Sequence, residues 1–361
     1  MSKLDIAQQR LLNQRLVGIQ FKRPEDAVQW LGAVQSQDYP GARWALGQRT
    51  ARATDVAVDE AFAKGTILRT HVMRPTWHFV MPADIRWMLA LTARRVNSAM
   101  AYYYRQAEVD DTLVVRSNTV LKKALRGGKQ LTRTELGKTL EKAGISATGV
   151  RLGFLTLRAE LDAIICSGAL RGKQHTYALL EERVPAARHL TRDESLAELA
   201  RRYFISHGPA QLQDFVWWSG LTMADTRKGV EFAKSHLAND VIAGKTYWFS
   251  SCMKVAKPAA ETRIHLLPNY DEYFISYKDR SAVSDSSLFK DPASIVKYLY
   301  GYIVVMNGLV IGGWKRRIDN GRATVEVRLP ISVDKDGRSA LQTAAQQYGA
   351  FLGKPVTLTV S

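Results

Sequence analysis

Two glutamines, Gln35 and Gln37, are the residues of this chain whose type and spacing first suggest chemistry. Apolar residues recur at helical spacing over 27–34, and the residue before Pro40 favours extended backbone, so a helix is predicted to end near Asp38. Gln35 in the last turn and Gln37 just beyond it would then direct two carboxamides into one space. Neutral amides offer hydrogen-bond donors and acceptors to a base, a sugar or a water.

The elements around this pair belong to a large, basic chain. It has 361 residues and a formal charge of 51 − 34 = +17, and 46% of its residues are hydrophobic. Such a chain can fill two to four cores, and polyanions are the usual partners of so large a positive field. The composition therefore favours a folded protein that binds nucleic acid.

Several classes of protein are excluded by what the sequence lacks. Cys166 and Cys252 are far apart and have no neighbours at metal-ligand spacing, which excludes a disulfide framework and a zinc ribbon. We expect no metal and no cofactor. The chain has no long apolar run and no signal-peptide core at its start, so we expect no membrane partner and a cytoplasmic, nucleoid-associated location.

The organising signal is a unit that occurs three times, in which helices precede a short β-hairpin. In the clearest copy, Thr132 and Glu135 form the capping-box pattern of a helix start. A third helix is predicted after Gly144 and through Ile165, and extended runs on both sides of the turn at 172–175 form the hairpin. Three helices and a hairpin make a winged helix, whose third helix and wing usually face DNA.

The pattern changes to short strands from about Arg263. Asn307-Gly308 lies between two apolar runs and is the strongest short-range signal for a hairpin; Asn320-Gly321 repeats it. The fold class is therefore predicted to be α+β, with three tandem winged-helix units and a C-terminal β-rich domain that forms a small barrel. The predicted ranges are 1–81 for the first unit, 82–116 for a helical connector, 117–190 and 191–260 for the second and third units, and 261–361 for the barrel.

Basic residues cluster where such units would meet DNA. Residues 69–105 contain six arginines and one acid, and residues 116–138 contain seven lysines or arginines and one acid. Arrays of this kind neutralise phosphates. The residues predicted to contact DNA are Arg69, Lys122, Lys123, Lys173, His175, Lys315, Arg316 and Arg317.

Taken together, these features resemble the AlkZ-like winged-helix DNA glycosylases. The segments that carry the resemblance are, in order, Leu31 to Asp38, Leu68 to Val80, Gly208 to Thr222, Leu267 to Tyr273 and Gly308 to Arg317. That family removes alkylated bases, including those in interstrand crosslinks. The resemblance implies a monofunctional glycosylase that hydrolyses the N-glycosidic bond of N7-alkylguanine-type purines in double-stranded DNA during base excision repair, and it leaves open whether crosslinks are unhooked.

The resemblance also assigns roles to residues. The first and third residues of the family's Gln-x-Gln motif are catalytic, which corresponds to Gln35 and Gln37, whereas Ser36 stands where the family usually has an apolar residue. Asp38 could act as a base or simply as a helix cap. Arg74 and His78, on a predicted hairpin, could line the site.

The alternative from another class is a winged-helix transcription regulator that binds DNA without catalysis. Three different units in one chain argue against the two-fold symmetry of a simple operator, and a monomer is expected. Release of a free base from alkylated DNA distinguishes the two.

Overall fold

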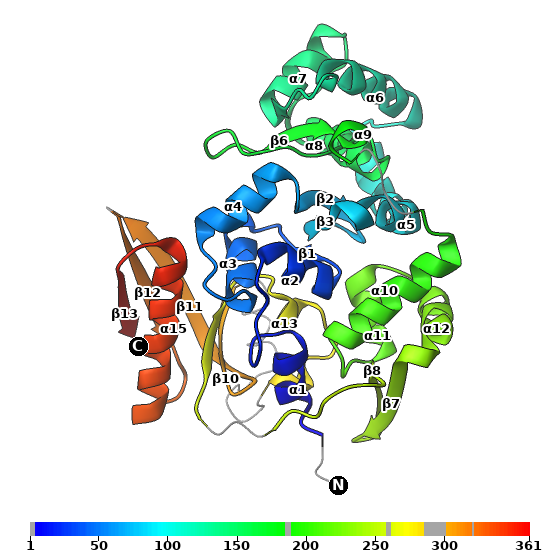
Figure 1. Cartoon of the computed structure of the whole chain (residues 1–361). Helices are drawn as coiled ribbons and strands as arrows, with labels where there is room; N and C mark the ends of the chain where they lie inside the picture. The colour runs from blue at the N-terminus through cyan, green and yellow to red at the C-terminus, as the bar shows by residue number, and fades with distance from the viewer. Residues whose placement is uncertain (1–3, 185–188, 258–260, 285–300, 320) are drawn as a thin grey trace.

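The computed structural model describes residues 4–184, 189–257, 261–284, 301–319 and 321–361. Helices and strands are mixed along the chain, as the α+β prediction requires (Figure 1). The described residues contain two three-stranded sheets, one two-stranded sheet and one five-stranded sheet.

The first unit follows helix α1 (Ile6–Asn13) and carries the Gln-x-Gln motif. Its sheet has the order β1-β3-β2. Its elements are α2 (Pro24–Leu31), β1 (Val34–Gln35), α3 (Tyr39–Arg49), α4 (Asp55–Lys64), β2 (Leu68–Val72) and β3 (Arg74–Val80).

The predicted end of helix α2 near Asp38 is wrong. The helix stops at Leu31 because Gly32 adopts a φ of +82°, a left-handed conformation that only glycine takes readily. Two residues later the chain joins a sheet, where Gln35 pairs with His78 of β3. The apolar residues at helical spacing continued past the true helix end because Val34 is buried as a strand residue.

The long helix α5 (Pro82–Gln106) follows the elements of the first unit and precedes those of the second. The capping box of Thr132 and Glu135 is confirmed at the start of α7. The elements of the second unit are α6 (Asp111–Leu125), β4 (Leu131–Thr132), α7 (Arg133–Lys142), α8 (Gly149–Leu161), β5 (Ile165–Ser167), β6 (Thr176–Leu179) and the short α9 (Leu180–Arg183).

The third helix of this unit is shorter than predicted. It ends at Leu161, and Ala163 has a positive φ of 56°, so the chain reverses before Ile165. Ile165 then pairs with Leu179 in the sheet. A buried apolar run of this length fits a helix or a strand equally well, and sheet pairing decided between them.

The third unit repeats the order of helices followed by a hairpin. Gly220 ends its second helix in the left-handed conformation. The elements are α10 (Arg192–Ser206), α11 (Leu212–Ser219), α12 (Met223–Phe232), a 3₁₀ turn (Lys234–His236), β7 (Leu237–Ile242) and β8 (Lys245–Ser250). The order of elements thus recurs three times, and the assignment of each copy as a winged helix stays a prediction.

The C-terminal part is an open sheet with the order β13-β12-β11-β10-β9 rather than the expected barrel. Within the described residues β9 and β13 are its edges, because each pairs with one neighbour only. Helix α15 lies beside the sheet and packs against both edge strands (Figure 1). Its elements are β9 (Ile264–Leu267), α13 (Glu272–Ile275), a 3₁₀ turn (Ser281–Val283), β10 (Tyr302–Met306), β11 (Leu309–Asp319), β12 (Arg322–Arg328), α15 (Lys335–Leu352) and β13 (Val356–Val360).

The hairpin signals in this region are confirmed. Asn307 and Gly308 have φ values of 49° and 90° and join β10 to β11, as a two-residue turn of this type requires. The second signal also lies between two paired strands, β11 and β12, where Gly321 has a φ of 78°. Asn320 lies outside the described residues.

One core joins the first unit to the C-terminal sheet. Trp44 of α3 packs against Tyr348 and Phe351 of α15, with ring centroids 5.1 and 5.2 Å apart. All three side chains are buried, and each aromatic of this size contributes roughly 2–3 kcal/mol through burial. Helix α3, which begins directly after the Gln-x-Gln motif, is thereby fixed from its far side.

Candidate active site

Gln35 is held between a strand and a buried carboxylate. It lies opposite His78 in the β1–β3 pair and is only 6% exposed. Its backbone N–H donates to Oε1 of Glu272 over 2.7 Å, and its side-chain Oε1 lies 3.5 Å from Nη2 of Arg74. Gln35 is therefore held by its backbone N–H and by its side-chain oxygen.

Gln37 contacts the same strand but faces solvent. Its Oε1 accepts from the backbone N–H of Trp77 over 3.4 Å, while Ser36 N–H donates to the carbonyl of Trp77 over 2.7 Å. Within the described part of the chain, neither Gln35 nor Gln37 has a hydrogen-bond partner for its side-chain Nε2. The structure thus brings both predicted glutamines to one strand, with two amide nitrogens available to a ligand.

The end of helix α2 cannot supply negative potential to this site, because the helix stops at Leu31. The motif instead precedes α3, and Asp38 is the N-cap residue of that helix. Since the N-terminal end of a helix carries partial positive charge, negative charge next to the motif comes from side chains, namely Asp38 and Glu272, which accepts from the Gln35 N–H. Gln35 is therefore held by pairing between β1 and β3, and not by the end of a helix as the sequence suggested.

Asp38 connects the motif to the C-terminal sheet. Its side chain makes no capping hydrogen bond, and its Oδ2 accepts from the Tyr302 hydroxyl over 2.5 Å. The Arg316 guanidinium lies 5.4 Å from the centre of the Tyr302 ring and donates to the Tyr348 hydroxyl over 2.9 Å. Arg316 is therefore half-buried beneath the site, not a free surface cation as expected.

His78 is fully buried and neutral. Its Nδ1 donates to the carbonyl of Thr76 over 2.9 Å, which leaves Nε2 as an acceptor 3.4 Å from Nη2 of Arg74. Burial, reinforced by the nearby charge of Arg74, lowers the pKa of His78 to about 3. At neutral pH His78 can accept a hydrogen bond but cannot act as a cation or a general acid.

Arg74 brings positive charge next to Gln35. Burial lowers the pKa of this guanidinium, and the charge of Glu272 partly offsets that effect. Its Nε is buried and has no hydrogen-bond partner among the described residues. Arg74 therefore keeps an unused hydrogen-bond donor inside the protein, on the guanidinium that contacts Gln35.

Arg69 supports the motif from behind and does not face open solvent, contrary to the expectation of a surface contact. It is 7% exposed, its Nε donates to the carbonyl of Ser36 over 3.1 Å, and its guanidinium lies 4.3 Å from the Trp77 ring. Burial lowers its pKa to about 10, so it remains charged. Glu160, buried in α8, bonds to His71 and to the Trp77 indole and supplies the opposing charge.

His175 is also placed differently from expectation. Its ring packs edge-on against Tyr39, with centroids 4.7 Å apart, so the hairpin of the second unit touches the start of α3. Burial, with smaller effects from Arg69 and Arg43, lowers the pKa of His175 to about 4. It is a neutral packing residue and not an exposed wing residue.

The remaining predicted DNA contacts lie at the surface. Lys173 is exposed on the hairpin turn and Lys123 is exposed on α6, whereas Lys122 is half-buried. Lys315 and Arg317 are exposed on β11, where Arg317 pairs with Asp319 over 2.8 Å. These side chains can reach a polyanion without rearrangement.

The only signal for Glu272 in the sequence is the acidic pair Asp271-Glu272, which is unusual in so basic a chain. Asp271 pairs with Arg49 over 2.8 Å with both side chains fully buried. Glu272 instead contacts Gln35, so it is a site residue that sequence reasoning missed.

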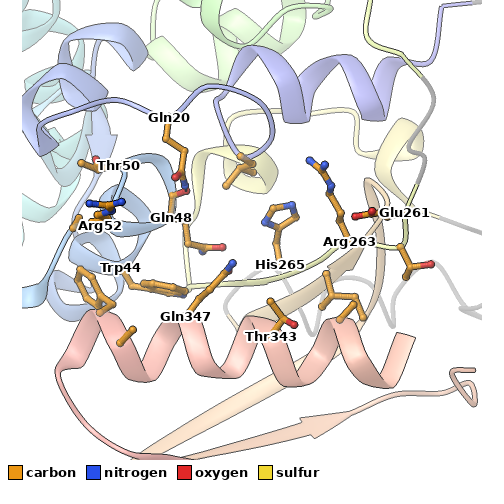
Figure 2. A pocket seen from close by; sticks show the side chains of 18 of the residues that line it. Gln20, Trp44, Gln48, Thr50, Arg52, Glu261, Arg263, His265, Thr343 and Gln347 are labelled. Atoms are coloured by element: carbon orange, nitrogen blue, oxygen red, sulfur yellow. The ribbon is translucent and has the colours of Figure 1, made fainter. Parts of the chain in front are cut away.

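A separate cavity of about 1060 Å³ lies between α3, β9 and α15. Figure 2 shows its polar lining, which includes Gln48, His265 and Gln347. It contains none of the predicted site residues, so volume alone does not locate the chemistry. No group of three or more His, Cys, Asp or Glu side chains suited to a metal occurs in the described ranges.

The fold is that of a known class of DNA repair enzyme. The structure superposes on DNA glycosylase AlkZ of Streptomyces sahachiroi with a TM-score of 0.79, covering 98% of both chains at 21% sequence identity. A curated relative, the interstrand DNA cross-link repair glycosylase of the same organism, is 24% identical over 302 residues, which cover 80% of this chain and 81% of the relative.

The family described as DNA glycosylase AlkZ-like matches residues 28–351. This chain therefore belongs to the AlkZ-like DNA glycosylase family and is a DNA glycosylase, a hydrolase of N-glycosyl bonds in DNA. The transcription-regulator alternative receives no support from these relationships. None of the helices in the described ranges is both long and apolar enough to span a bilayer.

Proposed function

We propose that this glycosylase hydrolyses the N-glycosidic bond of alkylated purines of the N7-alkylguanine type in double-stranded DNA, including purines joined in interstrand crosslinks. The observation that carries the proposal is that Gln35 and Gln37 both contact strand β3, with Gln35 beside Arg74 and a neutral His78. The family membership and the crosslink-repair relative support the choice of substrate.

The chemistry of the lesion explains why two amides can suffice. An N7-alkylated purine carries a positive charge and is already a good leaving group, so its departure requires little acid. The reaction instead requires a positioned water and stabilisation of a sugar that develops oxocarbenium character. Carboxamide oxygens can orient a water and offer partial negative charge without being strong bases.

The geometry favours distinct roles for the two glutamines. Gln37 is exposed and can orient the attacking water, while Gln35 is nearly buried and can hold that water or the sugar. Asp38 lies next to Gln37 and can stabilise positive charge on the sugar, although its Oδ2 is bonded to Tyr302. Arg74, half-buried beside Gln35, supplies a positive charge that can attract a phosphate of the lesion strand.

The surface cations extend this site along DNA. Lys123, Lys173, Lys315 and Arg317 are exposed on three different elements and can contact phosphates on both sides of the lesion. A crosslinked base stays tethered to the opposite strand and cannot be extruded completely, whereas a free lesion can be flipped from the stack. An exposed Gln37 suits the crosslinked substrate because the reacting sugar need not enter a closed pocket.

The test is base release from a duplex oligonucleotide that contains one N7-methylguanine, measured with enzyme in excess. We expect wild-type protein to release the free base, and Gln35→Ala and Gln37→Ala each to lower the rate by about 100-fold. Gln48→Ala is the matched control, since Gln48 is a glutamine on α3 that lines the separate cavity. Binding without base release from this or any other alkylated purine would contradict the proposal.

A second duplex tests the crosslink part of the proposal. It carries an N7–N7 guanine crosslink and is resolved on a denaturing gel, where unhooking converts one slow band to single strands. We expect unhooking that requires Gln37. Release of N7-methylguanine without unhooking would restrict the substrate to single lesions.

A further inference from the structure

We propose that Glu272 is a positioning residue that fixes the first catalytic glutamine, and this inference rests on the proposed function. Glu272 lies on α13, about 240 residues from the motif in sequence, and is completely buried. Its Oε1 accepts from the backbone N–H of Gln35 over 2.7 Å. Glu272 therefore binds the edge of strand β1 that faces away from β3.

Strand β1 needs such a partner because it is short and lies at the edge of its sheet. It has two residues, and the sheet order β1-β3-β2 leaves it paired on one side only. Ser36 N–H points to β3, where it donates to the carbonyl of Trp77. Successive N–H groups of a strand point in opposite directions, so the N–H of Gln35 points away from β3 and would be unsatisfied without Glu272.

The carboxylate of Glu272 is itself held in one orientation. Its Oε2 accepts from the Trp218 indole over 2.9 Å and from the Ser276 hydroxyl, and Nε2 of His207 lies 3.5 Å away. Burial alone would raise the pKa of Glu272, but these contacts and the Gln35 amide outweigh burial and lower the pKa to about 2. The group is thus an anion with a fixed direction at neutral pH.

The charge of Glu272 also acts on the cation beside the site. Arg74 is buried enough for its pKa to fall, and the nearby negative charge of Glu272 opposes that fall. Arg74 in turn lies 3.5 Å from Oε1 of Gln35 and 3.4 Å from Nε2 of His78. One buried anion thereby fixes the backbone of Gln35 and favours the charged form of the group that contacts its side chain.

A general role in folding is the competing explanation, and the neighbouring acid separates the two. Asp271 lies on the same short segment, is equally buried, and pairs with Arg49. Among the described residues it makes no hydrogen bond or ion pair with Gln35, Arg74 or His78. Loss of either carboxylate removes a buried anion from the start of α13, but only loss of Glu272 removes the acceptor of the Gln35 N–H.

The experiment compares Glu272→Gln with Asp271→Asn. Rates of N7-methylguanine release are measured with enzyme in excess, and duplex affinity and thermal stability are measured in parallel. We expect Glu272→Gln to lower the rate by about 10- to 100-fold, the effect of a small misplacement of a reacting group, with affinity unchanged within about 2-fold. Asp271→Asn should lower stability at least as much but leave the rate per folded molecule near that of wild type.

A readout independent of activity uses protein labelled with ¹⁵N-glutamine. A short hydrogen bond to a carboxylate moves an amide proton downfield, so the Gln35 resonance should shift in Glu272→Gln and stay unchanged in Asp271→Asn. If the wild type releases no base, the proposed function fails while this signal still tests the contact. A wild-type rate in Glu272→Gln, or equal rate losses in both variants, would overturn the positioning role.

If Glu272→Gln does not fold, Ser276→Ala and Trp218→Phe replace it. Each removes one donor to Oε2 and leaves the carboxylate in place, free to rotate. We expect rate losses of about 3-fold or more in each, together with a shift of the Gln35 amide. No change in either quantity for both variants would equally reject the proposal.

Discussion

The hydroxyl of Tyr302 donates a 2.5 Å hydrogen bond to Oδ2 of Asp38, the residue that follows Gln37. Tyr302 belongs to β10 of the C-terminal sheet, and Asp38 begins helix α3 of the first unit. This contact joins segments 264 residues apart in sequence at the site itself. The C-terminal sheet therefore takes part in shaping the Gln-x-Gln segment.

Removal of the Tyr302 hydroxyl should lower stability and disturb the site. In Tyr302→Phe the Asp38 carboxylate loses a donor, and a hydrogen bond to a charged group in this half-buried setting is worth about 1–2 kcal/mol. We expect the free energy of unfolding, measured in urea, to fall by that amount and base release to slow by a few-fold. Tyr103→Phe changes an exposed tyrosine and should alter neither.

Replacement of the unusual Ser36 should stabilise the protein. Its side chain is fully buried, and within the described residues its Oγ has no hydrogen-bond partner. An unsatisfied buried hydroxyl costs about 1–3 kcal/mol, so Ser36→Ala should raise the free energy of unfolding by about 1 kcal/mol with base release unchanged. Ser276→Ala removes a hydroxyl that is bonded to Glu272 and should lower stability. Equal stability of Ser36→Ala and wild type would argue that the hydroxyl is satisfied.

The buried His78 should make stability depend on pH in a defined direction. Its pKa is about 3 in the folded protein and near 6.5 in the unfolded chain, so the unfolded state binds more protons between these values. The resulting stability is present in full above pH 6.5 and is lost as pH falls towards 3. The slope reaches about 1.4 kcal/mol per pH unit for this group. Urea titrations from pH 7 to 4.5 should show a smaller slope for His78→Asn than for wild type.

Exposed and buried basic residues should affect DNA binding differently. Lys173→Ala removes an exposed cation, so affinity should fall for every duplex sequence and the slope of log K against log salt should decrease by about 0.9. Lys234→Ala, whose lysine is already paired with Glu231, should change the slope little. Fluorescence anisotropy across a salt series measures both the affinity and the salt slope. If Lys234→Ala lowered the slope as much as Lys173→Ala, the charge of Lys173 would act at long range and not by contact with a phosphate.

Arg69 provides the contrasting case. Because its guanidinium bonds to Ser36 and covers Trp77, Arg69→Lys should keep the charge but lose the contact with the carbonyl of Ser36. We expect base release to slow by about 10-fold while the salt dependence of binding stays that of wild type. A reduced salt slope with an unchanged rate would instead identify Arg69 as a phosphate contact.

Local signals in the sequence were reliable where one short segment fixes its own geometry. The capping box of Thr132 and Glu135 and the Asn307-Gly308 turn both lie where they were predicted. Each depends on backbone conformations and hydrogen bonds within a few residues. Such features need no knowledge of the rest of the fold.

Predictions failed where a distant segment decided the outcome. Gln35 was predicted to lie in the last turn of a helix, but that helix ends before Gly32 and Gln35 pairs with β3. Ile165 was predicted to lie in the helix that became α8, but it is a strand residue that pairs with Leu179. Arg69 and His175 are of residue types that usually lie at the surface. In this fold Trp77 packs against Arg69, and Tyr39 packs against His175. Within the described residues the expected barrel is an open sheet, because β13 pairs with β12 and not with β9 at the opposite edge.

The sequence by itself determined the repeated order of helices and hairpins, the basic character of the chain, the family it resembles and the two glutamines that we propose as its site. Only the tertiary structure decided how those glutamines are held. Strand β3 lies on one side of them, Glu272 binds Gln35 from the other, and Tyr302 secures the adjacent Asp38. These contacts connect residues far apart in the chain, and their hydrogen bonds form only when packing excludes water and brings the partners together.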